Sequence, residues 1–314
     1  MSDIVVVGSV NIDLTTHLPR WPQVGETVTA TRTQAGLGGK GANQAVAAAR
    51  LGAKVSLIGA VGADGFGQQV TALLTEANLD LILETRPGEA TGMAFIDLGP
   101  GGDNIIRLAP GANASLTPDI ILRHAPSIAR AKILLLQNEI PLAASLQAAQ
   151  IARRHGVTVI MDPAPAPQPM WAADTLAHFD ILTPNAHEAA LISGHTPHSL
   201  IEGEMTASAL TRLGPRGVIV TMGAQGAAWQ IDASRGHKAA PKVKAVDTVG
   251  AGDCFNGTLA VFLAEGATPE QAIQMAVDAA ALATTRAGAA AAAPKLSDLL
   301  GFQAEQAAPP LTTH

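Results

Sequence analysis

Residues 247–253, Asp-Thr-Val-Gly-Ala-Gly-Asp, carry the strongest chemical signal in the sequence. Gly250 and Gly252 bracket Ala251 at the predicted start of a helix, where free backbone N–H groups and the positive end of the helix dipole point outward together. Such a pocket would stabilise the charge on a transferring phosphoryl group, with the Asp253 carboxylate at its edge as a general base. The alternative is structural, because an acid at a helix N-terminus interacts favourably with the dipole.

A second glycine-rich segment, residues 36–41 (Gly-Leu-Gly-Gly-Lys-Gly), formally matches the dinucleotide-binding pattern G-x-G-x-x-G. It follows a thin Thr-rich strand and lacks an acidic residue about 20 positions on, so an NAD-dependent dehydrogenase is a weak alternative. A P-loop is excluded because Lys40 is followed by Gly41 rather than by Ser or Thr. Approachable backbone, the Lys40 cation and Asn43 in the first turn of the next predicted helix suit the binding of sugar hydroxyls.

Short β-branched runs alternate with segments of helical period along most of the chain. This alternation predicts an α/β fold: a doubly wound, mostly parallel central sheet flanked by helices. Helices are predicted around residues 42–49, 255–262 and 272–279. The predicted strands are residues 4–7, 55–58, 133–136, 157–160, 179–182 and 218–220.

Polar residues follow several of these predicted strands directly. Ligands of open parallel sheets bind beyond the carboxyl ends of the strands, so these side chains are expected to line one rim that suits a polyhydroxylated ligand. Each of them alone could equally be a turn or cap residue. They are Asn11, Asp13, Asn138, Glu139, Asp162, Asn185 and Thr221.

Two segments lack intervening helices and predict a small β-sheet lid. In residues 24–35, Thr occupies every second position from 27 to 33. Residues 93–98 and 105–108 flank a Gly-Pro-Gly-Gly-Asp turn, which indicates a hairpin. A thin β layer beside a cleft can act as a lid, although an edge extension without function is the alternative. The expected division is a core of residues 1–14, 36–90 and 110–302, a lid of residues 15–35 and 91–109, and a loose tail of residues 303–314.

Composition limits the class of partner. The 314 residues are 47% hydrophobic and carry a formal net charge of -6, so no attraction to nucleic acid or to an anionic membrane is expected. The single cysteine, Cys254, rules out an internal disulfide framework and is expected in the core. The first residues run into a strand without a signal-type segment, so we expect a cytoplasmic protein.

With these residues in place, the chain resembles the PfkB, or ribokinase, family of carbohydrate kinases from residues 8–13 to residues 285–288. Residues 38–45 (Gly-Gly-Lys-Gly-Ala-Asn-Gln-Ala) and 247–257 match two family signatures. Residues 22–27, 110–113 and 163–166 resemble the ribokinase branch in particular. The resemblance implies a ribokinase-like fold and ATP-dependent phosphorylation of a primary sugar hydroxyl, with D-ribose converted to ribose 5-phosphate as the first expectation.

The resemblance also implies roles for individual residues. Asp253 would be the general base, with Gly250, Ala251 and Gly252 as the anion hole. Asn11, Asp13, Gly39, Lys40, Asn43 and Glu139 would bind the sugar, and Asn185, Thr221, Gly223, Gly226 and Gly252 would bind ATP. Glu188 would help to place Mg²⁺ through water, and a monovalent cation, K⁺, would lie near Asp247, Val249, Ala283, Arg286, Gly288 and Ala292.

Three positions depart from the family pattern. Ala292 stands where Ser is usual, which leaves the strength of K⁺ dependence open. Val277 lies near the adenine where Asn or His is common, which leaves the nucleotide-base preference open. Asp162 replaces the more usual Asn before Pro163.

Two further interpretations of function stay open at this point. One is a kinase of the same family for a nucleoside or another sugar, since lid residues select the substrate. The other, from a different class, is a sugar-binding regulator that has lost catalysis. The predicted partners are therefore a small-molecule sugar and ATP, and the resemblance implies a homodimer formed through the β lid.

Overall fold

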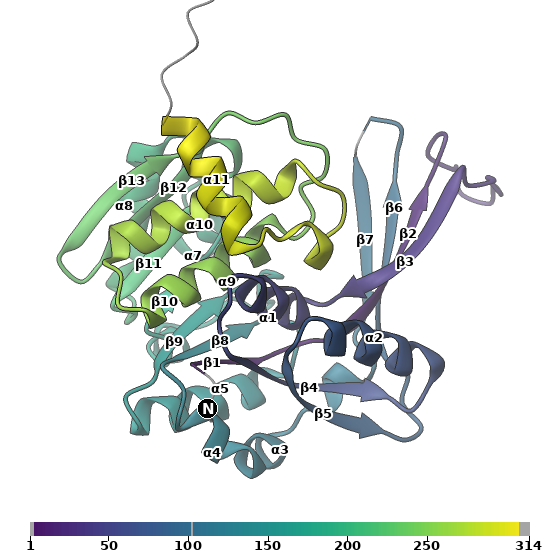
Figure 1. Cartoon of the computed structure of the whole chain (residues 1–314), viewed down its shortest axis with the longest axis horizontal. Helices are drawn as coiled ribbons and strands as arrows, with labels where there is room; N and C mark the ends of the chain where they lie inside the picture. Colours follow the sequence, from purple (N-terminus) through teal and green to yellow (C-terminus); the bar gives the residue numbers. More distant parts are fainter. Residues whose placement is uncertain (1–2, 102, 308–314) are drawn as a thin grey trace, which may run out of the picture.

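The computed structural model describes residues 3–101 and 103–307, and its centre is a nine-stranded sheet (Figure 1). The strand order is β13-β12-β11-β10-β9-β8-β1-β4-β5. Seven of these strands run parallel from β11 to β5, while β12 and β13 are antiparallel at one end. The bounds are β1 (Ile4–Val7), β4 (Val55–Gly62), β5 (Asp80–Arg86), β8 (Ile133–Gln137), β9 (Thr158–Asp162), β10 (Ile181–Leu182), β11 (Gly217–Thr221), β12 (Gly226–Ile231) and β13 (Ser234–Ala239).

Helices cover both faces of this sheet, which explains why its central strands are apolar on both sides. Within β1, Ile4 and Val6 pack into one core while Val5 and Val7 pack into the other, as the two-residue period of a strand requires. The first core is covered by α1 (Lys40–Arg50), α2 (Gly65–Glu76), α9 (Ala251–Ala264), α10 (Pro269–Thr284) and α11 (Leu296–Ala307). The second is covered by α3 (Pro118–Arg123), α4 (Ala125–Ile128), α5 (Leu142–Arg154), α6 (Ala173–Leu176), α7 (Ala186–Ser193) and α8 (Leu200–Thr211).

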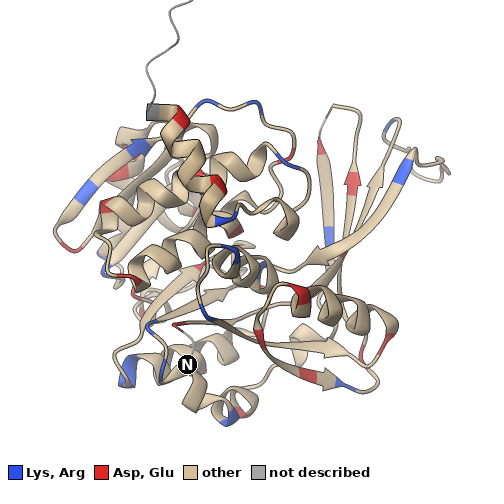
Figure 2. Cartoon of the chain, viewed as in Figure 1, with Lys and Arg blue, Asp and Glu red and all other residues tan. Residues whose placement is uncertain are grey.

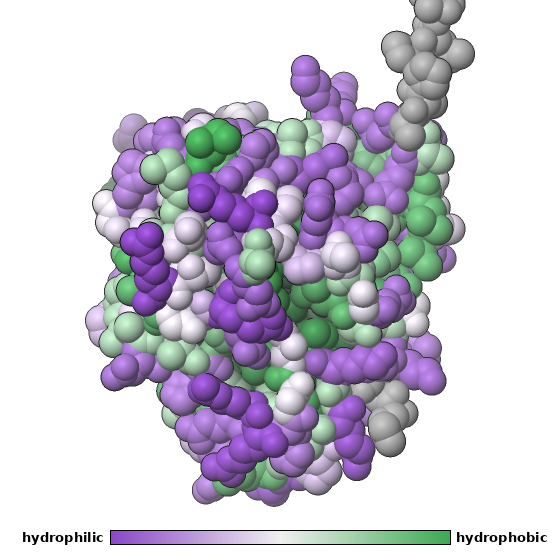
Figure 3. Space-filling model, turned by 90° about the vertical axis from the view of Figure 1, so that its left-hand side faces the viewer, coloured by the Kyte–Doolittle hydropathy of each residue, from purple (hydrophilic) through white to green (hydrophobic). Residues whose placement is uncertain are grey.

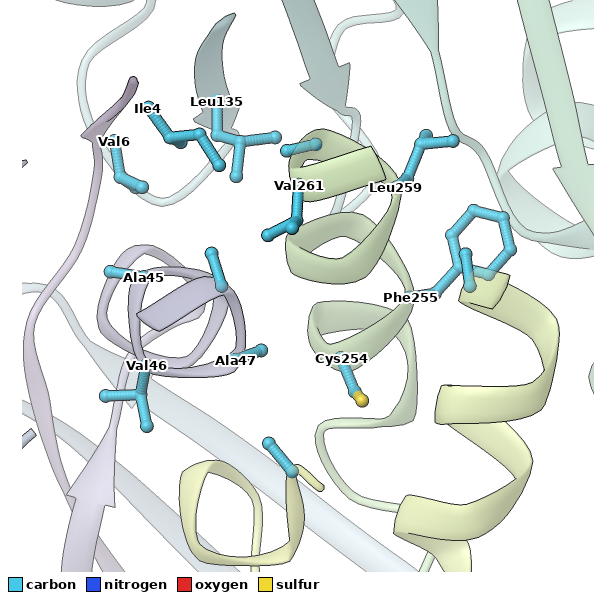
Figure 4. Close-up of a cluster of buried hydrophobic side chains, with 14 of the residues drawn as sticks. Ile4, Val6, Ala45, Val46, Ala47, Leu135, Cys254, Phe255, Leu259 and Val261 are labelled. Atoms are coloured by element: carbon cyan, nitrogen blue, oxygen red, sulfur yellow. The ribbon is translucent and has the colours of Figure 1, made fainter. Parts of the chain in front are cut away.

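Helices α1 and α9 lie side by side in the first core (Figure 4). Their contact is close because Gly257 of α9 has no side chain: a Cβ atom there would lie 2.7 Å from both the Ala47 methyl carbon and the Gln44 carbonyl oxygen. Neighbouring positions on α9 are also buried, among them Cys254 at 2% exposure, as expected from the sequence. Burial raises the pKa of the Cys254 thiol to about 12.

A separate four-stranded sheet, β3-β2-β6-β7, projects from the main body and confirms the predicted lid sheet (Figure 1). Its strands are β2 (Asn11–His17), β3 (Arg32–Gly38), β6 (Gly92–Leu98) and β7 (Asn104–Ala109), so the predicted hairpin is present. These strands extend beyond the expected lid ranges, because β2 begins at Asn11 and β3 ends at Gly38.

One predicted lid strand is wrong over part of its length. Residues 24–30 form no strand although their Thr alternation predicted one, and β3 begins only at Arg32. The physical reason is that the neighbouring strand ends too early. Strand β2 ends at His17, which pairs with Arg32, and prolines follow it at positions 19 and 22. Proline cannot donate to a β ladder, so residues 24–30 have no strand to pair with on that side.

Other elements differ from the sequence-based expectation at the edges of the sheet. Strands β5, β12 and β13 are not predicted, and β10 contains two residues rather than four. The alternation of β13 is between half-buried and exposed residues, without the apolar run of a central strand. Helix α11 continues through residues 303–307, for which a loose tail is expected, and residues 308–314 lie outside the described part of the chain.

Positive and negative residues are not separated onto different parts of the fold. Lys and Arg are scattered among Asp and Glu over the elements in Figure 2. At the β13 end, Arg235 pairs with Glu204 of α8. The face in Figure 3 mixes hydrophilic and apolar side chains. Within residues 3–101 and 103–307, no helix combines the length and the hydropathy needed to cross a bilayer.

Candidate active site

Asp253 lies in the first turn of α9, as the sequence predicts, and its side chain is 5% exposed. Gly250 precedes the helix in the left-handed region, with φ of 76°. A side chain at Gly250 would also meet the backbone of Ala289, with a Cβ–Cα distance of 2.7 Å. The backbone N–H groups at the start of a helix have no partner within the helix, and Gly250 and Gly252 stand at this start together with Asp253. The Ala251 N–H donates to the Thr248 carbonyl at 3.3 Å.

Both oxygens of Asp253 accept hydrogen bonds from α1. The Asn43 side-chain amide donates to Oδ2 at 2.9 Å, and the Gln44 amide donates to Oδ1 at 3.2 Å. Gln44 is missing from the sequence-predicted site. The one indication of this role in the sequence is the position of Gln44 next to Asn43, but adjacent residues of a helix do not ordinarily face the same group.

Lys40 lies among acids at the N-terminus of α1. Its backbone N–H donates to Glu139 Oε2 at 3.1 Å, and Ser9 Oγ donates to the same oxygen at 2.5 Å. The Lys40 ammonium lies 4.0 Å from Asp162 Oδ2. Burial lowers the pKa of Lys40, but the carboxylates of Asp253, Asp162, Glu139 and Glu188 outweigh it, so the net shift is upward and Lys40 stays charged.

Two acids of the predicted site region, Asp13 and Asp162, have raised pKa values. Burial, with smaller contributions from Glu139 and Asp253, raises the pKa of Asp13 to about 7. Burial also raises the pKa of Asp162 to about 8, against the opposing effect of Lys40. Buried acids with raised pKa values are typical of sites that bind or transfer charge.

The predicted sugar-binding residues lie where the lid meets the sheet. Asn11 begins β2, and its side-chain oxygen accepts a hydrogen bond from the Asn113 amide at 2.7 Å. A cavity of about 340 Å³ opens beside them, between the end of β7 and the segment after β8. It is lined by Asn11, Leu108, Ala109, Pro110, Asn113, Ala114, Asn138, Glu139, Ile140, Pro141 and Pro165.

The predicted nucleotide side begins at α7. Asn185 caps this helix and forms a capping box with Glu188: the Glu188 N–H donates to Asn185 Oδ1 at 2.9 Å, and the Asn185 N–H donates to Glu188 Oε2 at 2.8 Å. Asn185 also bridges to Thr221 at the end of β11. Gly223 and Gly226 flank the short turn η2 (Gly223–Gln225), and both have positive φ. Asn185 and Glu188 therefore also stabilise the start of α7, apart from any contact with a nucleotide.

Most of the residues expected around a monovalent cation belong to two connected loops, while Ala283 lies in the last turn of α10. Asp247 ties them together, because its carboxylate accepts from the Val249 N–H at 3.0 Å and from the Gly288 N–H at 2.9 Å. The Arg286 N–H donates to the Ala283 carbonyl, and Ala292 is buried in η3 (Ala290–Ala292). The Arg50 guanidinium at the end of α1 holds the second loop, with Nη1 2.6 Å from the carbonyl oxygens of Ala291 and Ala293.

Comparisons with known proteins match this arrangement. Residues 1–296 match the pfkB family of carbohydrate kinases. The ribokinase of Haemophilus influenzae is 37% identical over 303 residues, which cover 95% of this chain and 97% of that protein. The deoxyribokinase of Salmonella typhi is 34% identical over 295 residues, covering 94% and 96%. The solved structure of Arabidopsis thaliana ribokinase complexed with ribose and ATP has a TM-score of 0.88 at 31% identity and covers 96% of this chain and 98% of that one.

The chain belongs to the pfkB family of carbohydrate kinases. Its sheet and lid are the ribokinase-like fold expected from the sequence. The weak dehydrogenase interpretation of residues 36–41 is therefore set aside. In the structure these residues span the end of β3 and the first turn of α1, and they do not follow a strand of the central sheet.

Proposed function

We propose that this protein transfers the γ-phosphoryl group of ATP to the primary hydroxyl of a sugar, and that D-ribose is converted to ribose 5-phosphate. The observation that carries this proposal is the buried Asp253 carboxylate in the first turn of α9, where a helix leaves backbone amides without partners of its own. An acid and a set of amide donors around one point are what phosphoryl transfer to an alcohol requires. The names of the relatives, ribokinase and a ribokinase with ribose and ATP, support the choice of sugar and nucleotide.

The residues proposed to bind the sugar, of which Asn11 and Glu139 line the cavity, have the chemistry to hold it. Asn11, Asp13, Lys40, Asn43 and Glu139 offer both donors and acceptors, and Gly39 lets the chain turn tightly into α1 with φ of 88°. Closure of the lid sheet over the sugar would exclude water, which competes with the sugar hydroxyl for the phosphoryl group. Sugar-dependent closure would therefore limit the hydrolysis of ATP.

Asp253 would accept the proton of the primary hydroxyl as its oxygen attacks the γ-phosphorus and the bond to the β-phosphate oxygen breaks. The amides of Gly250 to Gly252 would stabilise the charge on the transferring group. Lys40, held in the charged state by the surrounding carboxylates, would add a positive charge beside it. The proposed arrangement would hold the two reactants in line, and such positioning accounts for much of the rate in these reactions.

The proposed ATP side consists of Asn185, Thr221, Gly223 and Gly226, with Mg²⁺ near Glu188. Glu188 fits this role because it is a buried carboxylate close enough to Lys40 and Asp162 to alter their pKa values. Mg²⁺ bound to nucleotide phosphates keeps several waters and needs only one or two protein carboxylates. When bound, the ion would offset the charge of the β- and γ-phosphates.

A monovalent cation, K⁺, is proposed beside the anion hole. The donors that fit are backbone and carboxylate oxygens of Asp247, Val249, Ala283, Arg286, Gly288 and Ala292. The two loops that carry most of them are joined by the Asp247 hydrogen bonds, so these oxygens come from one connected unit. Ala292 can supply only its carbonyl oxygen, which predicts weaker dependence on K⁺ than a Ser would give.

We also propose a homodimer, a division into domains and a cellular location. A homodimer through the lid is supported by exposed apolar residues on β6 and β7: Phe95, Ile105, Ile106 and Leu108 are 36%, 51%, 48% and 44% exposed. The division into core, lid and tail, and a cytoplasmic location, are also proposed. Neither location nor domain division alters the assignment of the site.

The deciding experiment measures ADP release with ATP and Mg²⁺ over a panel of D-ribose, deoxyribose, hexoses and nucleosides. We expect the highest kcat/KM with D-ribose. Activity confined to deoxyribose or a nucleoside would change the proposed substrate and leave the proposed reaction in place.

The Asp253→Asn variant should lose about 10²-fold or more in kcat while still binding sugar, as expected for loss of a general base. No ADP release with any acceptor, together with sugar binding, would identify a regulator instead.

A further inference from the structure

We propose that Gln44 is a positioning residue for Asp253, one whose amide fixes the orientation of the carboxylate that takes the sugar proton. The inference rests on the proposed role of Asp253 as the general base. Gln44 itself would touch neither sugar nor nucleotide, since it is 0% exposed and lies between α1, α9, β8 and β9. Its action would pass entirely through the groups that it bonds.

The Gln44 amide nitrogen donates to two carboxylates at once. Nε2 lies 3.2 Å from Asp253 Oδ1 and 3.0 Å from Asp162 Oδ2. An NH₂ group has two hydrogens, so both donors are used. Asn43 donates to the other Asp253 oxygen at 2.9 Å, and the carboxylate is therefore held at both ends by neighbouring residues of one helix.

The orientation of the Gln44 amide is itself fixed by Gln137. Gln137 Nε2 donates to Gln44 Oε1 at 2.7 Å, and Gln137 is also 0% exposed, at the end of β8. Rotating the Gln44 amide by half a turn would place its oxygen against two carboxylates and its NH₂ group against another NH₂ group. The bonds therefore run in one direction, from Gln137 through Gln44 to the two acids.

Close packing of α1 and α9 makes this contact possible. Gly257 of α9 lies against the Gln44 backbone, because a Cβ atom there would be 2.7 Å from the Gln44 carbonyl oxygen. The Asp253 side chain, one turn earlier on α9, therefore meets the Gln44 side chain at a depth where water cannot replace the bond. Hydrogen bonds from neutral amides to a buried carboxylate favour its ionised form, which is the form a base needs.

Several charged groups act on the same carboxylate. Asp13, Lys40 and Asp162 interact electrostatically with Asp253, as does the Cys254 thiol. Asp162 accepts the other hydrogen of the same Gln44 amide. Without Gln44, Asp253 and Asp162 would each lose one hydrogen-bond donor, and the Asp253 side chain would be held at one oxygen only, by Asn43.

The test is a kinetic comparison of Gln44→Met, which removes the donors at similar volume, with the parent enzyme. We expect kcat to fall about 10- to 100-fold, as for loss of a hydrogen bond to a charged group, with the KM for sugar changed less than about 3-fold. The acid limb of the kcat profile should move to higher pH. Gln44→Glu should lose more activity at neutral pH and recover part of it at lower pH, where the added carboxyl is protonated.

A double-mutant cycle separates positioning from a general loss of structure. In Asp253→Asn, the added Gln44→Met change should cost little further activity, because the group that it positions is already gone. Gln303→Met is the matched control, since Gln303 of α11 also donates to a carboxylate, Asp278 Oδ2 of α10 at 2.7 Å, but not to Asp253. It should change stability without moving the pH profile.

The outcomes distinguish this inference from the proposed function. An inactive Asp253→Asn with a fully active Gln44→Met would overturn the role of Gln44 and leave the base assigned. Full activity in Asp253→Asn would overturn the base itself. If Gln44→Met does not fold, Gln137→Met tests the same chain of bonds: a fall in kcat with the same pH shift supports the inference, and an unchanged profile contradicts it.

Discussion

Gly257 of α9 lies against Ala47 of α1, so closely that a Cβ atom on Gly257 would be 2.7 Å from the Ala47 methyl carbon. This contact sets the distance between the two helices that carry the proposed chemistry. Lys40, Asn43 and Gln44 stand near the start of α1, and Asp253 stands one turn before Gly257 on α9. A glycine without any contact to ligand therefore governs the geometry of the site.

Gly257→Ala should move α9 away from α1 and weaken the Asn43 and Gln44 bonds to Asp253. We expect a loss of about 1–3 kcal/mol in the free energy of unfolding, typical of overpacking a core, and a fall in kcat. Denaturant titration and steady-state kinetics measure the two effects. Gly301→Ala in α11 is the control, because a Cβ atom at Gly301 would meet nothing within 4 Å and alanine favours a helix. Equal behaviour of the two variants would refute the packing argument.

Asp162→Asn should change how stability depends on pH. The pKa of Asp162 is about 8 in the folded protein, against 3.8 as its ordinary value, so between these pH values the folded state holds more protons than the unfolded state. The free energy of unfolding should therefore fall as pH rises from about 4 to 8. Asparagine cannot titrate and should flatten this fall, as followed by Tm from pH 4 to 9. Asp13 contributes in the same direction, with its pKa of about 7.

Asp174→Asn serves as the reference for that experiment, because Asp174 is exposed at the start of α6. Its pH profile should match that of the parent. If the fall in Tm is as steep in Asp162→Asn as in the parent, Asp162 of the parent is already ionised in the folded state, and its pairing with Lys40 dominates over burial.

Arg50→Gln should loosen the loop that ends in η3. Arg50 Nη1 lies 2.6 Å from the carbonyl oxygens of Ala291 and Ala293, and Ala289 of the same loop packs against Gly250. We expect a lower kcat, a KM for sugar close to that of the parent, and a stronger response to added KCl than to NaCl as the ion takes over the ordering of the loop. ADP release in both salts measures this.

Arg153→Gln provides a comparison at the end of another helix, since Arg153 also stands in the last turn, of α5. It should leave kcat unchanged in both salts. Identical salt responses of the parent and Arg50→Gln would contradict a link between Arg50 and the cation loop.

Ile105→Lys tests the proposed dimer. Ile105 is 51% exposed on β7, and a lysine there would have to be desolvated in a lid-to-lid interface. We expect the variant to sediment as a monomer where the parent sediments as a dimer. Leu300→Lys changes a residue of similar exposure, 52%, on α11 and should not alter the mass. A monomeric parent, or loss of the dimer in both variants, would argue against the lid as the interface.

Local patterns in the sequence were sufficient to predict the central strands, the principal helices and the hairpin of the lid. Ile4 to Val7 are apolar on both sides of the strand, and such a run forms a buried parallel strand in almost any arrangement of this kind. Edge elements gave weaker signals. Strand β13 alternates half-buried and exposed residues without an apolar run, and residues 24–30 alternate like a strand but have no partner after β2 ends.

The sequence by itself determined the type of each functional group, because the motifs around Lys40 and Asp253 place acids, amides and glycines at fixed local spacing. Only the tertiary structure decided which of these groups meet. Asn43 and Gln44 are 210 and 209 positions from Asp253 along the chain, and the Asp253 contact depends on the width of the gap between α1 and α9. Side-chain amides carry no local signal of their distant partner, since that partner is chosen by how helices pack across a sheet.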